Sequence, residues 1–387
     1  MDKAAFMNQV LEALVDSIDV PPSHYKLAIE RYESLGRWFH RDGSPVAELE
    51  PDVLPQGSFR LGTPTRPVFE HHDYDLDLVC HVLMTKGDTT QERLKRLIGD
   101  DVKAYAQANN LKADVEERKR CWRLPYADKV SFHLDVLPAI PNDEFVKQAL
   151  LKAGVADDEA VSAIAITDKD HPNYTVQSTD WPQSNPEGFA QWFEKRMRLG
   201  KMRHADFLVK QGHYASIQDV PMHECKTILQ RVIQLLKRHR DVMFKDNCDL
   251  RPISIIITTL AARAYRGQTD LYQALVDIVN AMPSLVRAQE PRIPNPVNPH
   301  EDFTDKWKND PRLERNFWTW HKRVAQDIER LADPEGPGEH SKFIKRAFDV
   351  SIDEDSLICF GVVPAAVIAA APRIHISSGP QPWSDRA

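Results

Sequence analysis

The chain lacks an excess of positive charge. Its 57 aspartates and glutamates outnumber its 50 lysines and arginines, and the formal net charge is −7 at pH 7. A protein that clamps long DNA or RNA normally has a basic balance, because the neutralised phosphates supply most of its affinity. The charge therefore argues against long nucleic acid as the partner. A small phosphorylated ligand would need only a few local cations.

Cysteines are few and scattered. The chain has five, at positions 80, 121, 225, 248 and 359, with no C-x-x-C pair and no Cys/His cluster at zinc spacing. The 15 histidines contain no H-E-x-x-H or comparable ligand set. Isolated cysteines in odd number are typical of reduced thiols in a cytosolic protein. We interpret the histidines, including His133, as structural.

Long apolar runs are missing too. The most apolar stretch, residues 362–371, is short and is interrupted by Pro364, so it cannot span a bilayer. Residues 1–10, MDKAAFMNQV, lack the basic start and the unbroken apolar run of a secretory signal. With 42% hydrophobic and 28% charged residues, the composition is ordinary for a soluble globular protein. We expect a cytoplasmic protein that does not contact membranes.

What the chain does contain is a concentration of acids near residue 75. Residues 73–79, DYDLDLV, alternate acidic and apolar side chains, which predicts a strand whose faces repeat every second residue. Asp75 and Asp77 would then point the same way. Two carboxylates that close repel each other unless a cation lies between them. Mg²⁺ is the favoured candidate, because it accepts oxygen ligands and leaves positions open for phosphates.

Two other stretches would complete such a site. The Gly57-Ser58 turn offers free backbone N–H groups and a hydroxyl to a phosphate. Residues 129–138, KVSFHLDVLP, alternate again and predict a second strand that carries Asp135. If the two strands pair, three acids converge. Two metals about 4 Å apart can activate an attacking hydroxyl and stabilise the oxygen that departs in a phosphoryl displacement.

Together these pieces resemble the nucleotidyltransferase superfamily of DNA polymerase beta. Within it, the chain resembles the bacterial cGAS/DncV-like nucleotidyltransferases, which make cyclic oligonucleotide signals in anti-phage defence. The matching stretches are PQGSFRLGT at 55–63, HLDVLPA at 133–139, SNPEGFAQWF at 184–193, LLKRHRD at 235–241 and NPVNPHEDF at 295–303. The zinc-binding insertion of the animal relative, cyclic GMP–AMP synthase, has no counterpart here.

The resemblance implies an α+β fold. We expect a polymerase-beta-like sheet and a helical second lobe, with the active site in the cleft between them. The expected units are N-terminal helices packing on the helical lobe (1–50), the nucleotidyltransferase core (51–185), the helical lobe (186–377) and a flexible tail (378–387). Periodicity predicts helices over residues 1–19, 23–39, 88–107, 144–152, 186–199, 222–244, 254–265 and 301–331, the last broken near residue 310. It predicts further strands over 111–124 and 162–167, and a turn over 125–128.

The resemblance also implies residue roles. Asp75, Asp77 and Asp135 would hold two Mg²⁺ ions, with Mn²⁺ as an alternative, and Asp135 would also help to activate the attacking hydroxyl. Donor-nucleotide contacts would come from Gln56, Gly57, Ser58, Lys237 and Ser254, with Arg60 and Asp302 as further candidates. Arg60 is as often a surface charge, and Asp302 reads equally as a helix cap.

Other polar residues have ordinary readings beside these roles. Arg123 could reach a phosphate or be a surface charge on its strand. Lys237 lies on a helix face that also carries Lys226, Gln230, Gln234 and Arg238. We interpret most of that face as solvent-exposed.

The implied reaction is template-independent. ATP and a second NTP would be joined into a cyclic di- or trinucleotide with release of pyrophosphate. A linear oligonucleotide synthase or a terminal transferase acting on RNA is the alternative enzyme, and an inactive nucleotide sensor is the alternative outside catalysis. We expect a monomer, with a C-terminal tail suited to conjugation to other proteins or to their regulation.

Overall fold

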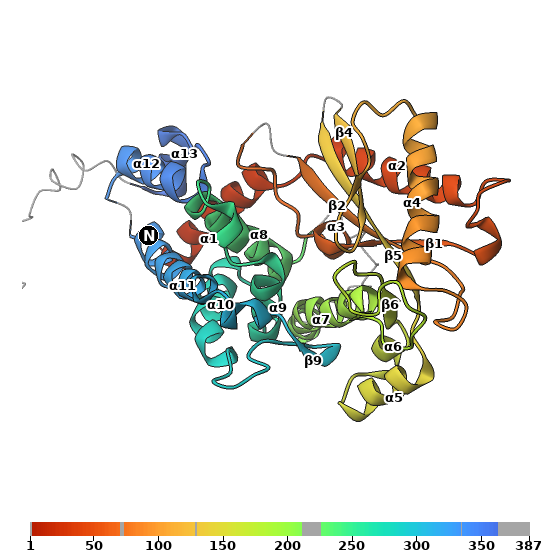
Figure 1. Cartoon of the computed structure of the whole chain (residues 1–387). Helices are drawn as coiled ribbons and strands as arrows, with labels where there is room; N and C mark the ends of the chain where they lie inside the picture. The colour runs from red at the N-terminus through yellow and green to blue at the C-terminus, as the bar shows by residue number, and fades with distance from the viewer. Residues whose placement is uncertain (1, 70–72, 128–129, 211–225, 334, 363–387) are drawn as a thin grey trace, which may run out of the picture.

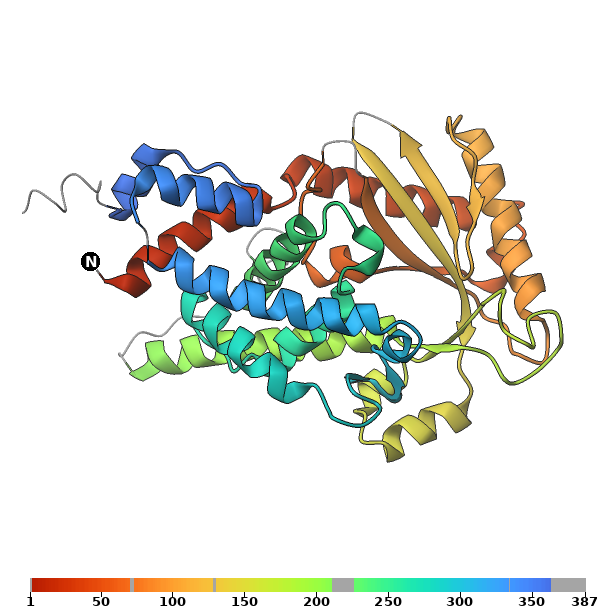
Figure 2. The same ribbon diagram turned by 60° about the vertical axis from the view of Figure 1, so that its left-hand side comes forward.

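The structure is a computed structural model that describes residues 2–69, 73–127, 130–210, 226–333 and 335–362. A lobe built on a β-sheet and a lobe built of helices lie side by side (Figure 1). The view turned by 60° shows the same division (Figure 2). The predicted α+β fold class is confirmed.

The sheet lobe is organised around two parallel strands, β2 (Tyr74–His81) and β5 (Ser131–Pro141). Among the described residues the strand order is β1-β2-β5-β4-β3, with β6 beside β5 and β7 beside β6. All pairs except β2·β5 are antiparallel. The remaining strands of this sheet are β1 (Asp52–Gln56), β3 (Glu116–Glu117), β4 (Trp122–Ala127), β6 (Ile164–Ile166) and β7 (Gln183–Ser184).

One face of the sheet is covered by α2 (Pro22–Phe39) and α4 (Gln91–Ala108), seen at the right of Figure 1. The strands turn their apolar alternation toward these helices, and Leu76, Leu124 and Leu134 are fully buried there. The opposite face carries the acidic alternation of β2 and faces the helical lobe. Side-chain alternation along two neighbouring strands therefore decides which sheet face is core and which is site.

The helical lobe has its own apolar core. It contains α1 (Lys3–Ile18), α7 (Pro186–Lys210), α8 (Ile228–Met243), α9 (Ser254–Ala264), α10 (Leu271–Leu285), α11 (Pro311–Leu331), α12 (Pro337–Phe348) and α13 (Glu354–Phe360). Shorter elements are α3 (Gly57–Leu61), α5 (Glu144–Lys152), α6 (Asp157–Ala160), β8 (Pro294–Asn295), β9 (Asn298–Asp302), η1 (Ala47–Leu49), η2 (Cys248–Leu250) and η3 (Asp305–Lys308).

The two N-terminal helices belong to different lobes. The apolar face of α1 packs in the core of the helical lobe, as expected. The expectation that α2 does the same is wrong, because Tyr25, Leu35 and Phe39 lie in the core of the sheet lobe. Periodicity shows that a helix has an apolar face but not which lobe covers it. The other proposed unit boundaries stay predictions, and residues 378–387 lie outside the described residues.

Two local predictions are corrected by pairing and capping. Residues 125–127 continue β4 instead of turning, because they pair with residues 131–133 of β5. Among the described residues, β3 lies beside β4 only at Trp122 and Arg123. Beyond that point β4 is an edge strand, where the missing N–H of Pro125 is tolerated. The helix expected from residue 222 begins at Ile228, where Thr227 and Gln230 form a capping box. Met222 and Cys225 lie outside the described residues.

The predicted helix over 301–331 is only partly helical. Its break is real, since Asp310 caps α11 and Pro311 occupies the first turn. The part before the break consists of the end of β9 and the 3₁₀ turn η3. Searched for membrane spans, the described part of the chain yields no helix that combines the necessary length and apolarity.

Candidate active site

The three predicted acids lie on one face of neighbouring strands. In the parallel ladder, Asp77 of β2 is paired with Asp135 of β5, and Asp75 is paired with His133. Tyr74, Leu76 and Leu78 point the other way and are at most 8% exposed. The sheet register therefore brings Asp75, Asp77 and Asp135 together on the face toward the helical lobe. We call these three residues the carboxylate wall.

Gly57 is required where the chain passes over Asp77. It ends β1 and begins α3 with φ +67, a left-handed conformation that favours glycine. A Cβ atom at this position would lie 2.2 Å from Asp77 Oδ2. Ser58 follows in the first turn of α3 and lines the cavity in front of Asp77. Gln56 pairs with Asp77 in the β1·β2 ladder, so its backbone borders the site.

Arg123 holds Asp135 in this structure. Its Nε and Nη2 donate to the two carboxylate oxygens of Asp135, both at 2.7 Å, and its guanidinium is 3.9 Å from Asp75. The cause is the antiparallel β4·β5 register, which sets Arg123 opposite Asp135 on the same face. Arg123 is therefore neither a surface charge nor a free phosphate ligand. It supplies positive charge to the carboxylate wall.

Even with Arg123 present, negative charge dominates the carboxylate wall. The pKa of Asp77 is raised to about 7, first because the surrounding protein excludes water from its carboxylate, and then because Asp75 and Asp135 are negative. Hard oxygen ligands of this kind suit Mg²⁺ or Mn²⁺. As the described side chains stand, no three His, Cys, Asp or Glu groups are arranged to hold a metal ion. The wall fits a divalent cation in residue type and strand position, with Asp135 engaged by Arg123.

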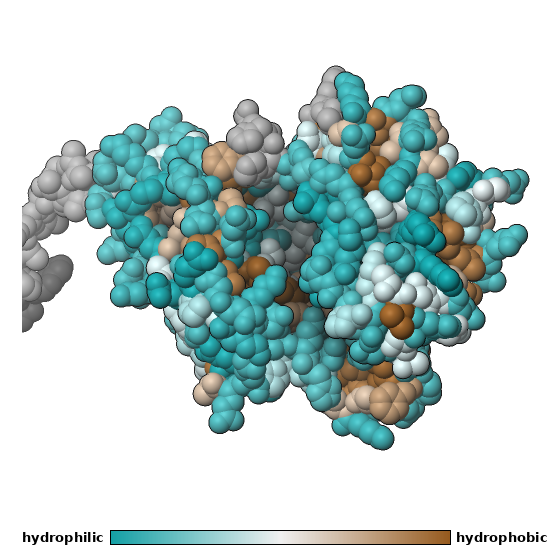
Figure 3. Space-filling view, in the orientation of Figure 1, coloured by the Kyte–Doolittle hydropathy of each residue, from teal (hydrophilic) through white to brown (hydrophobic). Residues whose placement is uncertain are grey.

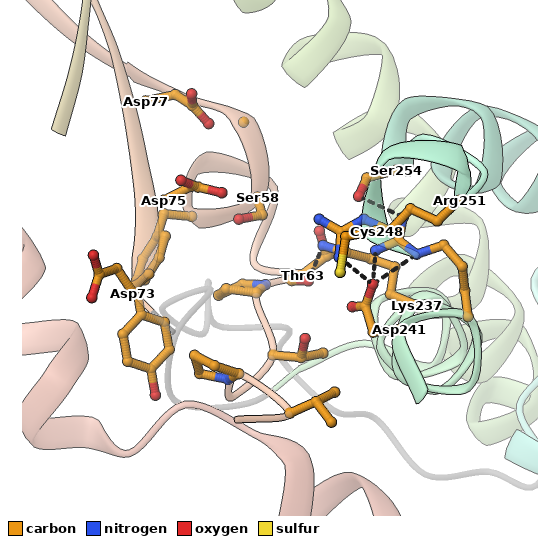
Figure 4. Close-up of a pocket in the computed structure, with 18 of the residues that line it drawn as sticks. Ser58, Thr63, Asp73, Asp75, Asp77, Lys237, Asp241, Cys248, Arg251 and Ser254 are labelled. Carbon is orange, nitrogen blue, oxygen red and sulfur yellow. Dashed lines mark hydrogen bonds and ion pairs between the residues drawn. The ribbon is translucent and has the colours of Figure 1, made fainter. Parts of the chain in front are cut away.

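The opposite wall of the cavity is cationic. It comes from the last turns of α8, the connection to α9 and the start of α9, and faces Asp75 and Asp77 across the cavity (Figure 4). Arg240 Nη1 donates to Ser254 Oγ at 2.9 Å, and its Nη2 is 2.7 Å from Asp241. Arg251 Nη1 also reaches Asp241, at 3.1 Å. The cationic wall, as defined here, consists of Lys237, Arg240, Lys245, Arg251 and Ser254.

Lys237 is buried, which corrects the expectation for its helix face. Its side chain is 6% exposed, and Gln230, Gln234 and Arg238 on the same face are equally buried. Its Nζ donates to the carbonyl of Thr63 at 2.8 Å. The pKa of Lys237 is lowered to about 8, first by burial and then by the charge of Arg240. The prediction of a solvent-exposed face is wrong because residues 61–66 cover it.

Two of the predicted nucleotide contacts are engaged elsewhere. Arg60 Nη2 and Nη1 pair with Glu187 at 3.1 Å and Glu194 at 2.7 Å on α7, so α3 is tied to the helical lobe. Asp302 ends β9 and is not part of a helix. Its carboxylate accepts hydrogen bonds from the backbone N–H groups of Arg292, Ile293 and Thr304, which organise that loop. Neither residue lines the cavity in front of Asp77, but Asp302 lines the second cavity, described next.

Two cavities meet at the carboxylate wall. The first, about 570 Å³, is lined by Asp75, Asp77, Ser58 and the cationic wall. The second, about 1670 Å³, is lined by Asp135 and Arg123 and continues to the basic run Arg118–Arg120 and to α5. The space-filling view shows the surface hollowed between the lobes (Figure 3). Asp75 and Asp77 therefore face one cavity and Asp135 the other.

Sequence reasoning missed the second cavity and most of the cationic wall. Arg240 and Asp241 stand in the LLKRHRD stretch, where only Lys237 was singled out. Helical spacing was the available signal, since residues 237, 240 and 241 share one face. For Arg251 and Lys245 the sequence offers no such signal, because they come from the connection between α8 and α9.

Comparison with known proteins agrees with this geometry. Residues 51–138 match the family model for the nucleotidyltransferase domain of cyclic GMP-AMP synthase DncV-like proteins. A c-di-GMP synthase from Roseivirga ehrenbergii is 26% identical over 353 residues, which cover 88% of this chain and 84% of the relative. The segment that carries the site is therefore similar to the DncV-like nucleotidyltransferase domain, and most of the chain is similar to a cyclic dinucleotide synthase. Both the Gly57-Ser58 turn and the three acids lie inside the matched segment.

Solved structures extend the likeness to the second lobe. CdnG from Bradyrhizobium diazoefficiens, in complex with GTP, aligns with a TM-score of 0.64 at 22% identity, covering 92% of this chain and 98% of that one. DncV from Vibrio cholerae, in complex with ATP and GTP, aligns with a TM-score of 0.55 at 19% identity, covering 92% and 88%. The two-lobed fold of this chain is therefore similar to theirs along nearly its whole length.

Proposed function

We propose that this nucleotidyltransferase joins two NTPs into a cyclic dinucleotide and releases pyrophosphate. The observation that carries the proposal is the first cavity, which has carboxylates on one wall and lysine, arginine and serine on the other. A nucleoside triphosphate bound to metal needs both kinds of group, acids for the metal and cations for the phosphates. The curated relatives that the chain resembles are cyclic dinucleotide synthases.

The donor NTP would occupy the first cavity. Lys237, Arg251 and Ser254 would bind its β- and γ-phosphates, and the backbone at Gly57 and Ser58 would approach the same chain of phosphates. The α-phosphate would then lie nearest the carboxylate wall. Asp75, Asp77 and Asp135 would hold the two Mg²⁺ ions, with Mn²⁺ as an alternative. Bound metal would supply charge neutralisation for the attacking and departing oxygens.

The acceptor NTP would occupy the second cavity, which Asp135 faces. Its ribose hydroxyl oxygen would form the new bond to the donor α-phosphorus, while the bond from that phosphorus to pyrophosphate breaks. Asp135 would accept the hydroxyl proton once its carboxylate has left Arg123. Arg123 would then be free to contact the acceptor phosphates. A second round, with the linear product rebound, would close the ring.

Two features guide the choice of substrates. One relative is a c-di-GMP synthase, and the similar enzyme CdnG has been solved in complex with GTP. Both observations favour GTP as one of the two NTPs. The net charge of −7 favours free nucleotides over RNA as acceptors. As in other family members, the cyclic product would act as a second messenger in anti-phage defence. ATP remains the expected partner nucleotide.

Product analysis tests the proposal. The protein is incubated with all four NTPs and Mg²⁺, the mixture is treated with phosphatase, and the products are identified by mass spectrometry. A cyclic dinucleotide has no terminal phosphate and survives phosphatase. A variant carrying both Asp75→Asn and Asp77→Asn is the control for contaminating activity. Products that phosphatase degrades would replace the proposal with a linear oligonucleotide synthase, and products equal in the control would overturn it.

A further inference from the structure

The first cavity, proposed above for the donor NTP and called the donor cavity from here on, has one wall beside Ser58 with little regular structure of its own. Residues 61–66, which we call the cavity segment, link the end of α3 to the loop before β2. Pro64 has no N–H to donate. The backbone N–H groups of Thr63 and Arg66 reach the carbonyls of Ser58 and Ile18. The carbonyls of the cavity segment need other donors.

One face of α8 supplies those donors. Gln230 Nε2 donates to the carbonyl of Leu61 at 2.9 Å, and Gln234 Nε2 donates to that of Pro64 at 2.7 Å. Lys237 and Arg238 donate to the carbonyls of Thr63 and Arg66, at 2.8 and 3.2 Å. The spacing i, i+4, i+7 and i+8 sets all four side chains on the same side of the helix.

This polar face is buried against the cavity segment. Gln230 is 1% exposed, Gln234 is fully buried, and Lys237 is 6% exposed. A buried donor without a partner costs free energy, so this helix face suits a partner that offers carbonyls at this spacing. The cavity segment is that partner. Lys237 belongs both to this buried polar face and to the cationic wall. Its ammonium is fixed by Thr63 and faces the cavity.

Gln234 connects three elements. The two hydrogens of its amide go to the carbonyl of Pro64 and to Asp19 Oδ1, at 2.7 and 3.0 Å, and Asp19 is the C-cap residue of α1. Its own Oε1 is buried and has no hydrogen-bond partner among the described residues. For stability alone, an amide left half satisfied is worse than an apolar side chain of the same size. The amide is therefore better explained by what its two hydrogens hold in place.

We propose that Gln234 is a positioning residue, which holds the Pro64 carbonyl and thereby fixes Thr63 and the Lys237 ammonium against the donor triphosphate. The inference rests on the proposed function, because it takes the first cavity as the triphosphate site. Lysine carries three N–H donors, so Lys237 can keep Thr63 as a partner while it binds a phosphate oxygen. Gln234 acts on the nucleotide only through this chain of contacts.

Nucleotide affinity in matched glutamine variants tests the proposal. The probe is a GTP analogue with a methylene between the α- and β-phosphates, titrated with Mg²⁺ by calorimetry. Gln234→Met, which keeps the length but removes both donors, is expected to raise Kd about tenfold. Gln91→Met is the control, because Gln91 is also fully buried and holds a different loop, through the backbone N–H of Asp168. It is expected to change Kd by less than about twofold.

The decisive measurement is the double variant with Lys237→Met. If Gln234 acts through Lys237, Gln234→Met has no further effect on Kd once the ammonium is gone. An effect that persists in that background would overturn the proposal, and so would an unchanged Kd in Gln234→Met itself. Gln234→Asn, whose amide is too short to reach Pro64, carries the same expectations if the methionine variant does not fold.

The product assay separates this inference from the proposed function. If the wild-type protein binds the analogue but makes no cyclic product, the function fails while the role of Gln234 stands. If it makes the product and Gln234→Met binds normally, only the role of Gln234 fails. A wild-type protein that does not bind the analogue would overturn both.

Discussion

The two walls of the donor cavity are built by different physics. The carboxylate wall follows from strand register, which sets Asp77 beside Asp135 whatever the rest of the chain does. The cationic wall comes from the end of one helix, the start of the next and the connection between them. Backbone ladders therefore position the acids, whereas side-chain hydrogen bonds position the cations. The position of the acids therefore depends on the sheet, and that of the cations depends on the contacts of α8.

Each wall also holds one side chain of the opposite charge. Arg123 pairs with Asp135 among the acids, and Asp241 pairs with Arg240 and Arg251 among the cations. Like charges this close would otherwise raise the free energy of the folded state. A metal-bound triphosphate could replace both pairs at once, with its cations on one wall and its phosphates on the other. The comparison predicts different failures for the two walls: lost turnover for the acids and lost affinity for the cations.

The largest effect is expected on the carboxylate wall. Asp77→Asn should lower kcat by at least about 10³-fold, because it removes a proposed metal ligand where charge develops. Turnover of NTPs is measured beside Asp73→Asn, in which a nearby acid that pairs with His133 is changed and most turnover is retained. Full turnover in Asp77→Asn would remove the proposed site.

The same variant has a predicted effect on stability. The pKa of Asp77 is about 7 in the folded protein, above its ordinary value of 3.8. The folded state therefore binds more protons than the unfolded state between these values, and stability falls as pH rises through that window. Above pH 7 the neutral asparagine should leave Tm equal or higher. A Tm well below the wild-type value at pH 8 would mean that the carboxylate stabilises the fold.

Substitutions in the cationic wall should lower the affinity for an NTP. Lys237→Met should raise Kd for an NTP about 100-fold and change kcat much less, because it removes a buried cation that we propose contacts phosphate. Lys95→Met is the matched control, since Lys95, like Lys237, is buried and donates to a main-chain carbonyl, that of Lys119 at 2.8 Å. Equal losses of NTP affinity in both variants would point to destabilisation and away from phosphate binding.

A smaller effect is expected in the pH dependence of NTP affinity, which depends on the cationic wall. Because burial lowers the pKa of Lys237 to about 8, the protonated fraction of its amine falls as pH rises past that value. Phosphate binding needs the charged form, so Kd for an NTP should rise about tenfold between pH 7 and 9. In Lys237→Arg, whose guanidinium stays charged, Kd should be flat over this range. A rise of the same size in that variant would assign the titration to another group.

The smallest effect concerns Arg123, the cation that pairs with Asp135 of the carboxylate wall. Arg123→Gln should lower Kd for Mn²⁺ several-fold without nucleotide, because Asp135 no longer has a guanidinium that competes with the metal. Electron paramagnetic resonance of free Mn²⁺ measures this directly. Arg120→Gln is the control, since Arg120 pairs with Asp168 instead. Unchanged Mn²⁺ binding in Arg123→Gln would mean that Arg123 does not compete with the metal.

The carboxylate wall could be predicted because its information is local. Alternation over residues 73–79 indicates which side chains share a face. Only the pairing of β2 with β5 had to be assumed. Gly57 could be predicted from the Gly-Ser turn that precedes the acids, but the sequence does not show that a Cβ atom there would meet Asp77. The pairing of Arg123 with Asp135 needed the register of β4 on β5, which no stretch of sequence states.

The polar face of α8 could not be predicted, for a physical reason. Glutamine, lysine and arginine at helical spacing are usually solvated, and their partners here are main-chain carbonyls, which every residue has. The sequence therefore does not indicate that the polar face of α8 packs against the cavity segment. The prediction that α2 packs on the helical lobe was wrong for the same reason, since an apolar stripe does not show which surface it covers.

What the sequence determined by itself was the chemistry of one wall: three acids in strand alternation, a glycine-serine turn before them, and a charge balance suited to small nucleotides. Those features depend on residues close in the chain, where the strand period fixes direction. Tertiary structure alone decided the counter-charges, the second cavity and the buried face of α8. Each of these depends on contacts between distant segments, where register and packing, not local periodicity, decide which groups meet.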